Sequence, residues 1–105
     1  MEWGYQDFKK WIDEGCDPMI AQNITNLDIS SNKISEIPKE IGQLINLQKF
    51  NCFHNEISEI PKEIGQLINL QIFSCYNNQI SEIPKEIGKL INLQYFYCHY
   101  NSIFS

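Results

Sequence analysis

Three cysteines recur at intervals of 23 residues, and two of them stand close to a histidine. Cys52 lies two residues before His54, and Cys98 lies immediately before His99. Thiolate and imidazole groups bind zinc, but zinc ligands usually come in closely spaced pairs, as in C-x-x-C. The long spacing and the apolar neighbours of these cysteines instead favour small thiols buried in a core. We therefore predict no metal site and no cofactor.

The sequence also does not indicate a catalytic centre. A nucleophile requires a nearby base and a group that orients that base, and no Ser or Asp recurs beside the two histidines. Paired carboxylates can perform acid–base chemistry, but the repeated glutamates alternate with lysines and are typical of a solvated, charge-compensated surface. We predict a protein that is not an enzyme. The repeated charges are Glu36, Glu59 and Glu82, then Lys39, Lys62 and Lys85, then Glu40, Glu63 and Glu86.

The regular spacing of these residues reflects a sequence repeat. The fifteen residues that begin at Ile34 recur from Ile57 and from Ile80, and the only change is Lys89 in place of glutamine. A fixed period of this length predicts stacked units, each of which buries its apolar face against its neighbours. The units differ only in the eight residues that join one constant segment to the next. Such local variation on a constant frame is typical of a recognition surface.

Aligned columns predict the role of each position in the unit. Leu47, Phe50 and Cys52 have the spacing of inward-facing strand residues. The asparagine that follows is expected to form a ladder whose amides satisfy turn backbone groups. Proline fits the convex side, where no strand ladder needs its N–H, and Gly42, Gly65 and Gly88 are expected to serve a tight turn or a positive φ. The columns are Ile24, Leu47, Leu70, Leu93; Leu27, Phe50, Phe73, Phe96; Ile29, Cys52, Cys75, Cys98; Asn32, Asn55, Asn78, Asn101; and Ile34, Ile57, Ile80, Ile103.

This pattern resembles the leucine-rich repeat, L-x-x-L-x-L-x-x-N-x-L. The I-P-x-x-I-G-x-L-x-N segment that follows is similar to the 23-residue type of intracellular scaffold and Ras-binding proteins, and to short proteins of giant DNA viruses of amoebae. The resemblance implies an α/β fold, a short right-handed solenoid with a parallel concave sheet and extended or 3₁₀-like convex segments. The expected repeats are 24–46, 47–69, 70–92 and a partial unit 93–105.

Residues 1–23 are predicted to form a helical N-terminal cap. Tyr5, Phe8, Trp11 and Ile12 follow one face of a helix. Gly15 is a plausible helix stop. Asp17 and Pro18 then have the types expected at the cap and first position of a short second helical turn.

The last repeat has no sequence that would cap it, and we expect an open apolar end beside a free strand edge. Exposed edges invite pairing with another chain. Three explanations stay open: pairing with a second copy, a fragment or shortened gene product, and coverage by Phe104 and neighbouring tyrosines. The candidate self-association residues are Leu93, Phe96, Cys98, Ile103 and Phe104.

The solvent-facing strand positions form the candidate partner-binding surface. Their character shifts along the chain from small and polar to aromatic, and tyrosine is typical of interface anchors. The alternative is that these aromatics only stabilise the sheet. We predict that this concave aromatic face binds a protein or peptide, with self-assembly as a homodimer through the last repeat as the alternative function. The candidate residues are Lys49, Asn51, Phe53, His54, Ile72, Ser74, Tyr76, Tyr95, Tyr97, His99 and Tyr100.

Composition limits the class of partner and the location. The net charge is -5 and arginine is absent, which argues against nucleic acid because phosphate neutralisation needs clustered basic side chains. No apolar run approaches the length of a membrane span, so no membrane partner is expected. The N-terminus lacks the features of a signal peptide, and four cysteines then indicate a reducing compartment. We expect a cytoplasmic protein, with the cytoplasm of an infected host as one setting.

Overall fold

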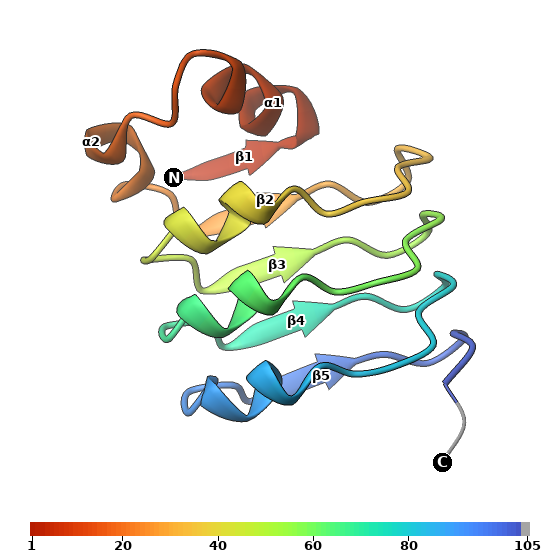
Figure 1. The fold of residues 1–105 in the computed structure, drawn as a ribbon. Coiled ribbons are helices and arrows are strands. Elements are labelled where there is room, and N and C mark those ends of the chain that lie inside the picture. Colours follow the sequence, from red (N-terminus) through yellow and green to blue (C-terminus); the bar gives the residue numbers. More distant parts are fainter. Residues whose placement is uncertain (104–105) are drawn as a thin grey trace.

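The computed structural model describes residues 1–103 and shows a stack of parallel strands (Figure 1). The five strands lie in chain order in one sheet. Their bounds are β1 Glu2–Gly4, β2 Asn26–Asp28, β3 Lys49–Asn51, β4 Ile72–Ser74 and β5 Tyr95–Tyr97. From β2 onward the register follows the repeat, so that Phe50 pairs with Phe73 and Phe73 pairs with Phe96. The predicted α/β solenoid with a parallel sheet is confirmed.

Short 3₁₀ helices form the second layer, on the opposite side of the core from the solvent-facing side of the sheet (Figure 1). They are η1 Lys39–Gln43, η2 Lys62–Gln66 and η3 Lys85–Lys89. Each follows a proline, whose φ is between -58° and -67°. Because proline fixes φ near this value and lacks an N–H, it begins a helical turn without losing a hydrogen bond. The 3₁₀-like convex segments are therefore confirmed.

The repeated glycines have a different role from the one predicted. Among residues 1–103, Gly15 is the only glycine with a positive φ, +101°. A Cβ at Gly42 would lie 3.0 Å from the Cβ of Glu63, and a Cβ at Gly65 would lie 3.2 Å from the carbonyl oxygen of Glu86. Glycine is needed there because the next repeat approaches too closely for a side chain, rather than for a turn or a positive φ.

The core runs through the stack between the strands and the 3₁₀ helices. Phe50 and Phe73 are fully buried, and the rings of Phe50, Phe73 and Phe96 stack in sequence with centroids 5.4 and 5.3 Å apart. Cys52 and Cys75 are fully buried beside them. Burial of each phenylalanine contributes about 1.5–3 kcal/mol of stability. The predicted inward positions of Phe and Cys are confirmed.

The asparagine column forms the predicted ladder. The side-chain amide of Asn55 donates to the carbonyl of Cys52 in its own repeat, 3.0 Å, and to that of Ile29 in the preceding repeat, 3.1 Å. Its Oδ1 accepts from the backbone N–H of Asn32, 3.0 Å. Because these backbone groups lie where the chain leaves the strand, one amide satisfies groups that no sheet bond reaches.

The N-terminal cap contains one strand and two helices. Helix α1 spans Tyr5–Asp13 and buries Phe8 and Trp11, and helix α2 spans Pro18–Ala21. The Asp17 side chain accepts from the Met19 N–H at 2.9 Å, as expected of a helix cap. The helices are confirmed. The strand β1, which pairs with β2 through Trp3 and Leu27, was not predicted from the sequence. Three residues are too few to show a strand period.

Candidate functional site

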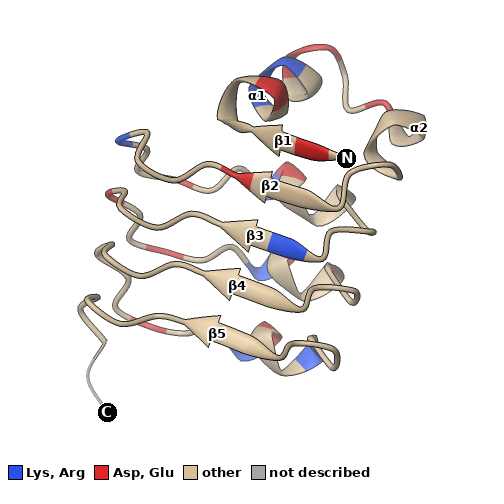
Figure 2. Cartoon of the chain, turned by 180° about the vertical axis from the view of Figure 1, so that it is seen from behind, with Lys and Arg blue, Asp and Glu red and all other residues tan. Residues whose placement is uncertain are grey.

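Alternate strand positions point to solvent on the face of the sheet away from the 3₁₀ helices, which we call the concave face. One row runs across the strands through Glu2, Asn26, Lys49, Ile72 and Tyr95, and the next through Gly4, Asp28, Asn51, Ser74 and Tyr97. Figure 2 shows charged residues on β1, β2 and β3 and none on β4 and β5. The concave face therefore changes from a charged half to an uncharged, partly aromatic half.

Just beyond the strands, Phe53, Tyr76 and His99 form a continuous aromatic stack. The ring centroids are 4.7 Å apart at both steps, and the planes differ by 3° and 5°. These residues come from three successive repeats at the same register, so the 23-residue period brings them into contact. Phe53 and Tyr76 are half-buried because their faces cover each other. The stack thus offers ring edges and polar ring atoms to a partner, rather than open faces.

A second row of residues borders the aromatic stack, where the chain turns away from the strands. His54, Asn77 and Tyr100 all have left-handed backbones, with φ of 54°, 55° and 57°. The N–H groups of His54 and Asn77 donate to the carbonyls of Tyr76 and His99 in the following repeat, both at 3.1 Å. These bonds hold a conformation that is unfavourable for residues other than glycine.

Asn77 also lies on the candidate surface, at the solvent-facing position that its column, shared with His54 and Tyr100, predicts from the sequence. Its side-chain nitrogen lies 3.1 Å from Nδ1 of His54. The ring of His54 also meets Phe53 and Tyr76 edge-on, with centroids 5.5 and 5.6 Å away.

The tyrosines of β5 are exposed on the concave face. Tyr95 and Tyr97 are 54% and 43% exposed, and their rings lie parallel with centroids 6.2 Å apart. Tyr100, at the adjoining turn, is 74% exposed. Large rigid side chains that are accessible and close together can bury much area on binding at a small cost in conformational entropy. This end of the face therefore has the strongest character of a recognition surface.

The remaining candidate residues differ in accessibility. Lys49 is exposed, and Asn51 and Ile72 are half-buried on the same face. Ser74 is only 6% exposed, so the expectation that it contacts a partner needs correction. It points to the concave side, but the larger side chains around it leave little of its surface accessible. The structure brings the other candidates together on β3–β5 and the turns that follow.

The candidate self-association residues gather at the last repeat. Leu93, Phe96, Cys98 and Ile103 are half-buried and pack against the core on one side only. The equivalent residues one repeat earlier, Leu70, Phe73, Cys75 and Ile80, are fully buried. Phe104, the fifth candidate, lies outside the described residues.

The cysteine column lacks the properties of a metal centre. Burial raises the pKa of the Cys52 thiol well above its usual value and that of Cys75 to about 12. Burial also raises the pKa of Cys16. Neutral thiols are poor metal ligands and poor nucleophiles. Among residues 1–103, no group of three or more His, Cys, Asp or Glu side chains could hold a metal ion.

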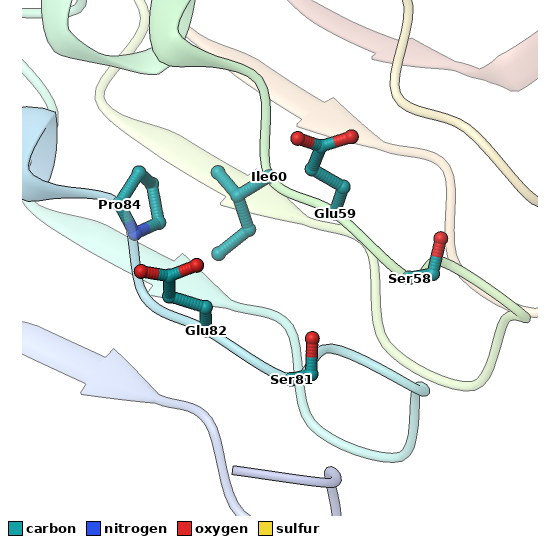
Figure 3. Close-up of a pocket in the computed structure, with 6 residues that line it drawn as sticks. All are labelled: Ser58, Glu59, Ile60, Ser81, Glu82 and Pro84. Atoms are coloured by element: carbon teal, nitrogen blue, oxygen red, sulfur yellow. The ribbon is translucent and has the colours of Figure 1, made fainter.

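The structure also has a shallow cavity of about 310 Å³ away from the concave face, between the segments that lead into η2 and η3 (Figure 3). Glu59 and Glu82 line it together with Ser58 and Ser81. The same residue types stand at equivalent positions of successive repeats, so the two carboxylates belong to the predicted repeated surface.

Two family models match most of the repeat region. One, described as Leucine Rich repeats (2 copies), matches residues 22–66, and the other, Leucine Rich Repeat, matches residues 69–90. No curated protein sequence matched significantly. Within residues 1–103, no helix has the length and apolar character needed to cross a membrane.

Solved structures show the same fold. A leucine-rich repeat protein of Leptospira interrogans has 44% identity and a TM-score of 0.78 over 80% of this chain. The functional domain of InlJ from Listeria monocytogenes, which includes a cysteine ladder, has 32% identity and a TM-score of 0.69 over 80%. A plant peptide hormone receptor, RGFR1 in complex with RGF2, has 29% identity and a TM-score of 0.73 over 96%.

This chain spans only 21%, 17% and 15% of the lengths of those three solved chains. The assignment to the 23-residue intracellular type, the likeness to proteins of giant DNA viruses and the cytoplasmic location remain predictions. The repeat columns, the parallel sheet, the asparagine ladder and the two family matches agree with one another. The chain belongs to the leucine-rich repeat family.

Proposed function

We propose that this protein binds a protein or peptide segment through the uncharged half of its concave face. The observation that carries the proposal is the exposure of Tyr95, Tyr97 and Tyr100, which lie together beside the aromatic stack. Exposed tyrosines at this density provide anchors that bury apolar area and also form hydrogen bonds. The structural similarity to a plant receptor in complex with RGF2 supports the same class of function.

The shape of the surface favours an extended peptide. The uncharged half covers two three-residue strands, β4 and β5, and their turns, whereas a standard interface buries about 800 Å² per partner. The aromatic stack presents ring edges rather than an open pocket. A peptide laid across the strands would contact Tyr95 and Tyr97 on one side and Tyr76 and His99 on the other.

The test begins with peptides selected from a random display library against the immobilised chain. Their affinity is then measured by fluorescence anisotropy for Tyr95→Ser with Tyr97→Ser, and for the triple variant that adds Tyr76→Ser. We expect a loss of at least tenfold in affinity, with the folded state checked by circular dichroism. The matched control, Lys62→Ser with Lys85→Ser on the 3₁₀ layer, should change affinity less than twofold. Equal affinity in all variants would overturn the proposal.

We propose self-assembly through the last repeat as a second function. Its support is the half-burial of Leu93, Phe96 and Cys98, whose equivalents in the preceding repeat are fully buried. Light scattering over a dilution series, with reductant present, tests it. A mass that stays at one chain at every concentration would overturn it, whatever the peptide experiment shows.

A further inference from the structure

We propose that the concave face recognises acidic peptide segments, whose Asp or Glu carboxylates accept hydrogen bonds from its uncharged half and pair with Lys49 on the border of that half. The inference rests on the proposed peptide binding and adds the chemistry of the partner. We call the groups that meet the carboxylates the donor surface. They are Lys49, Tyr76, Tyr95, Tyr97, His99 and Tyr100.

Acidic side chains are excluded from this part of the molecule. The chain has thirteen Asp and Glu residues and a net charge of -5. None of the thirteen lies in 49–54, 72–77 or 95–100, which contain β3, β4, β5 and the residues that follow each strand. Glu56 comes next after β3, and the equivalent positions in the two later repeats are uncharged. An acidic protein therefore keeps one surface free of carboxylates, where a negatively charged ligand is not repelled at close range.

Lys49 supplies a positive charge at the border of the uncharged half, on β3 (Figure 2). It is exposed, and its neighbours in register are Asn26 on β2 and Ile72 on β4, neither of which is a counter-ion. The carboxylate of Asp28, in the next row of β2, already accepts hydrogen bonds from the N–H and the hydroxyl of Ser30. The ammonium group of Lys49 is thus available to a carboxylate of a ligand, and such complementarity sets specificity.

The tyrosines provide hydrogen-bond donors beside this charge. Tyr95, Tyr97 and Tyr100 are exposed, and within residues 1–103 their hydroxyls have no hydrogen-bond partner. A phenol is neutral and carries one O–H, which bonds more strongly to an ionised acceptor than to a neutral one. The ionised acceptors of an unmodified peptide are carboxylates. These hydroxyls therefore distinguish Asp and Glu from Asn and Gln.

The aromatic stack favours the same sign of charge. Tyr76 lies between Phe53 and His99, with 4.7 Å between ring centroids on each side. Both faces of its ring are covered, so the ring edge and the hydroxyl are what a ligand can reach. An aromatic ring is electronegative on its face and electropositive at its edge. The covered faces therefore offer no cation site, whereas the accessible edge attracts a carboxylate.

The turn beside the stack indicates that its side chains take part in binding. Ser31, His54, Asn77 and Tyr100 share one column, and all have a left-handed φ between 54° and 57°. Glycine adopts this conformation without strain, yet the column holds four different residues and no glycine. Side chains that are kept in a strained backbone conformation are typical of binding sites. Tyr100 is the member of this column that belongs to the donor surface.

The spacing of the strands sets the length of the peptide and the placement of its acids. Neighbouring strands lie about 4.8 Å apart, so β3 and β5 are roughly 10 Å apart, and an extended peptide rises about 3.4 Å per residue. Roughly three or four residues laid across the strands therefore reach from Lys49 to Tyr95. Because alternate residues of an extended chain point to the same side, acids at positions i and i+2 face the donor surface together.

The first experiment selects peptides against the immobilised full chain from a display library. The randomised stretch lies inside a longer chain, so that no free terminus contributes a carboxylate. We expect Asp and Glu together to be at least twofold enriched over the unselected library, with a preference for the i, i+2 spacing. Lys and Arg should be depleted.

The second experiment uses the tightest acidic peptide, synthesised with both ends blocked, and an analogue in which each Asp and Glu is replaced by Asn and Gln. Fluorescence anisotropy should show at least tenfold weaker binding of the amide analogue to the wild type. Tyr95→Phe with Tyr97→Phe removes two hydroxyls and keeps both rings. This variant should bind the acidic peptide at least tenfold more weakly than the wild type does, and should change binding of the amide analogue less than twofold.

A matched pair of lysine variants tests the charge. Lys49→Gln should weaken binding of the acidic peptide at least threefold. Lys62→Gln removes the same charge from an exposed position of η2, on the opposite layer, and should change binding less than twofold.

The outcomes separate acid recognition from peptide binding in general. Peptides that bind the wild type and lose affinity for the Tyr→Ser variants, but show no excess of acids or an excess of Lys and Arg, would overturn acid recognition and leave the proposed function standing. Equal losses of the acidic peptide and its amide analogue in the Tyr→Phe variant would also overturn it. A library that yields no peptide for this face would overturn both.

Discussion

Asn78 accepts a hydrogen bond from the backbone N–H of Ile57, 21 residues earlier, through its side-chain oxygen at 3.0 Å. Its amide nitrogen donates to the carbonyls of Cys52 and Cys75, at 3.0 and 3.1 Å. It also reaches the carbonyl of Tyr76 at 3.3 Å, so one buried side chain connects four backbone groups in two successive repeats. The solenoid is held together along its axis by such side-chain bridges as well as by the sheet.

Replacement of Asn78 by alanine should destabilise the protein strongly. The change leaves the buried N–H of Ile57 without its partner, which costs about 1–3 kcal/mol. It also removes one of the two asparagine donors from the Cys52 and Cys75 carbonyls, which Asn55 and Asn101 still reach. We expect the free energy of unfolding, measured by urea denaturation, to fall by about 2 kcal/mol or more. Asn69→Ala is the matched control, because Asn69 donates to the Ile45 carbonyl at 3.1 Å in an exposed site. Its cost should be below about 1 kcal/mol; equal losses would contradict the ladder's role.

The two glycines Gly65 and Gly88 should respond differently to the same substitution. Gly65→Ala forces a Cβ against the backbone of Glu86 and should cost about 1–3 kcal/mol. Gly88→Ala meets open space and restricts the unfolded chain, so it should be neutral or stabilise by about 0.4–1 kcal/mol. Urea denaturation of both variants measures the difference. Similar effects at the two positions would show that the close approach between repeats is not what requires glycine.

Stability should decline at high pH because of the buried thiols. The pKa of Cys75 is about 12 in the folded chain, raised by burial from the model-peptide value of 9.0. The folded state therefore keeps a proton that the unfolded state loses, so the stabilisation is complete below pH 9 and is lost between pH 9 and pH 12. The slope is at most about 1.4 kcal/mol per pH unit for each such thiol.

The measurement for this prediction compares urea unfolding of wild type and Cys75→Ala from pH 8 to pH 11. Both proteins share every other titratable group, so the difference in slope isolates the thiol. We expect the free energy of unfolding of the variant to fall less steeply. Identical slopes would show that Cys75 ionises in the folded chain as it does in water.

The aromatic stack should contribute to stability through its central ring. Tyr76 stacks on Phe53 and on His99 at 4.7 Å, and each aromatic contact is worth about 0.5–1.5 kcal/mol beyond its buried area. Tyr76→Ala should therefore lower the free energy of unfolding by roughly 2 kcal/mol or more. Tyr100→Ala, at a mostly exposed ring, should cost about 0.5 kcal/mol. A larger loss of stability for Tyr100→Ala than for Tyr76→Ala would show that the stacking of Tyr76 on Phe53 and His99 is not the main stabilising contact of these rings.

Some of the candidate surface could be predicted from the sequence. The alternation around Phe50 and Phe73 indicated which strand positions face the core, and Tyr95 and Tyr97 were therefore assigned to the concave face. The burial of Ser74 could not be predicted, because it depends on the size of side chains from neighbouring strands. The role of Asn77 depends on its contact with His54, a residue 23 positions earlier.

The sequence by itself determined the period, the core columns, the asparagine ladder and helix α1. Each of these features has a fixed sequence period, so it is improbable that the pattern arises by chance. The period alone is therefore enough to recognise the feature. Only the tertiary structure decided the strand β1, the reason for Gly42 and Gly65, and the burial of Ser74. Each of these depends on how closely a segment that is distant in the sequence packs against the residue. That distance is set only when the repeats and the N-terminal cap are stacked.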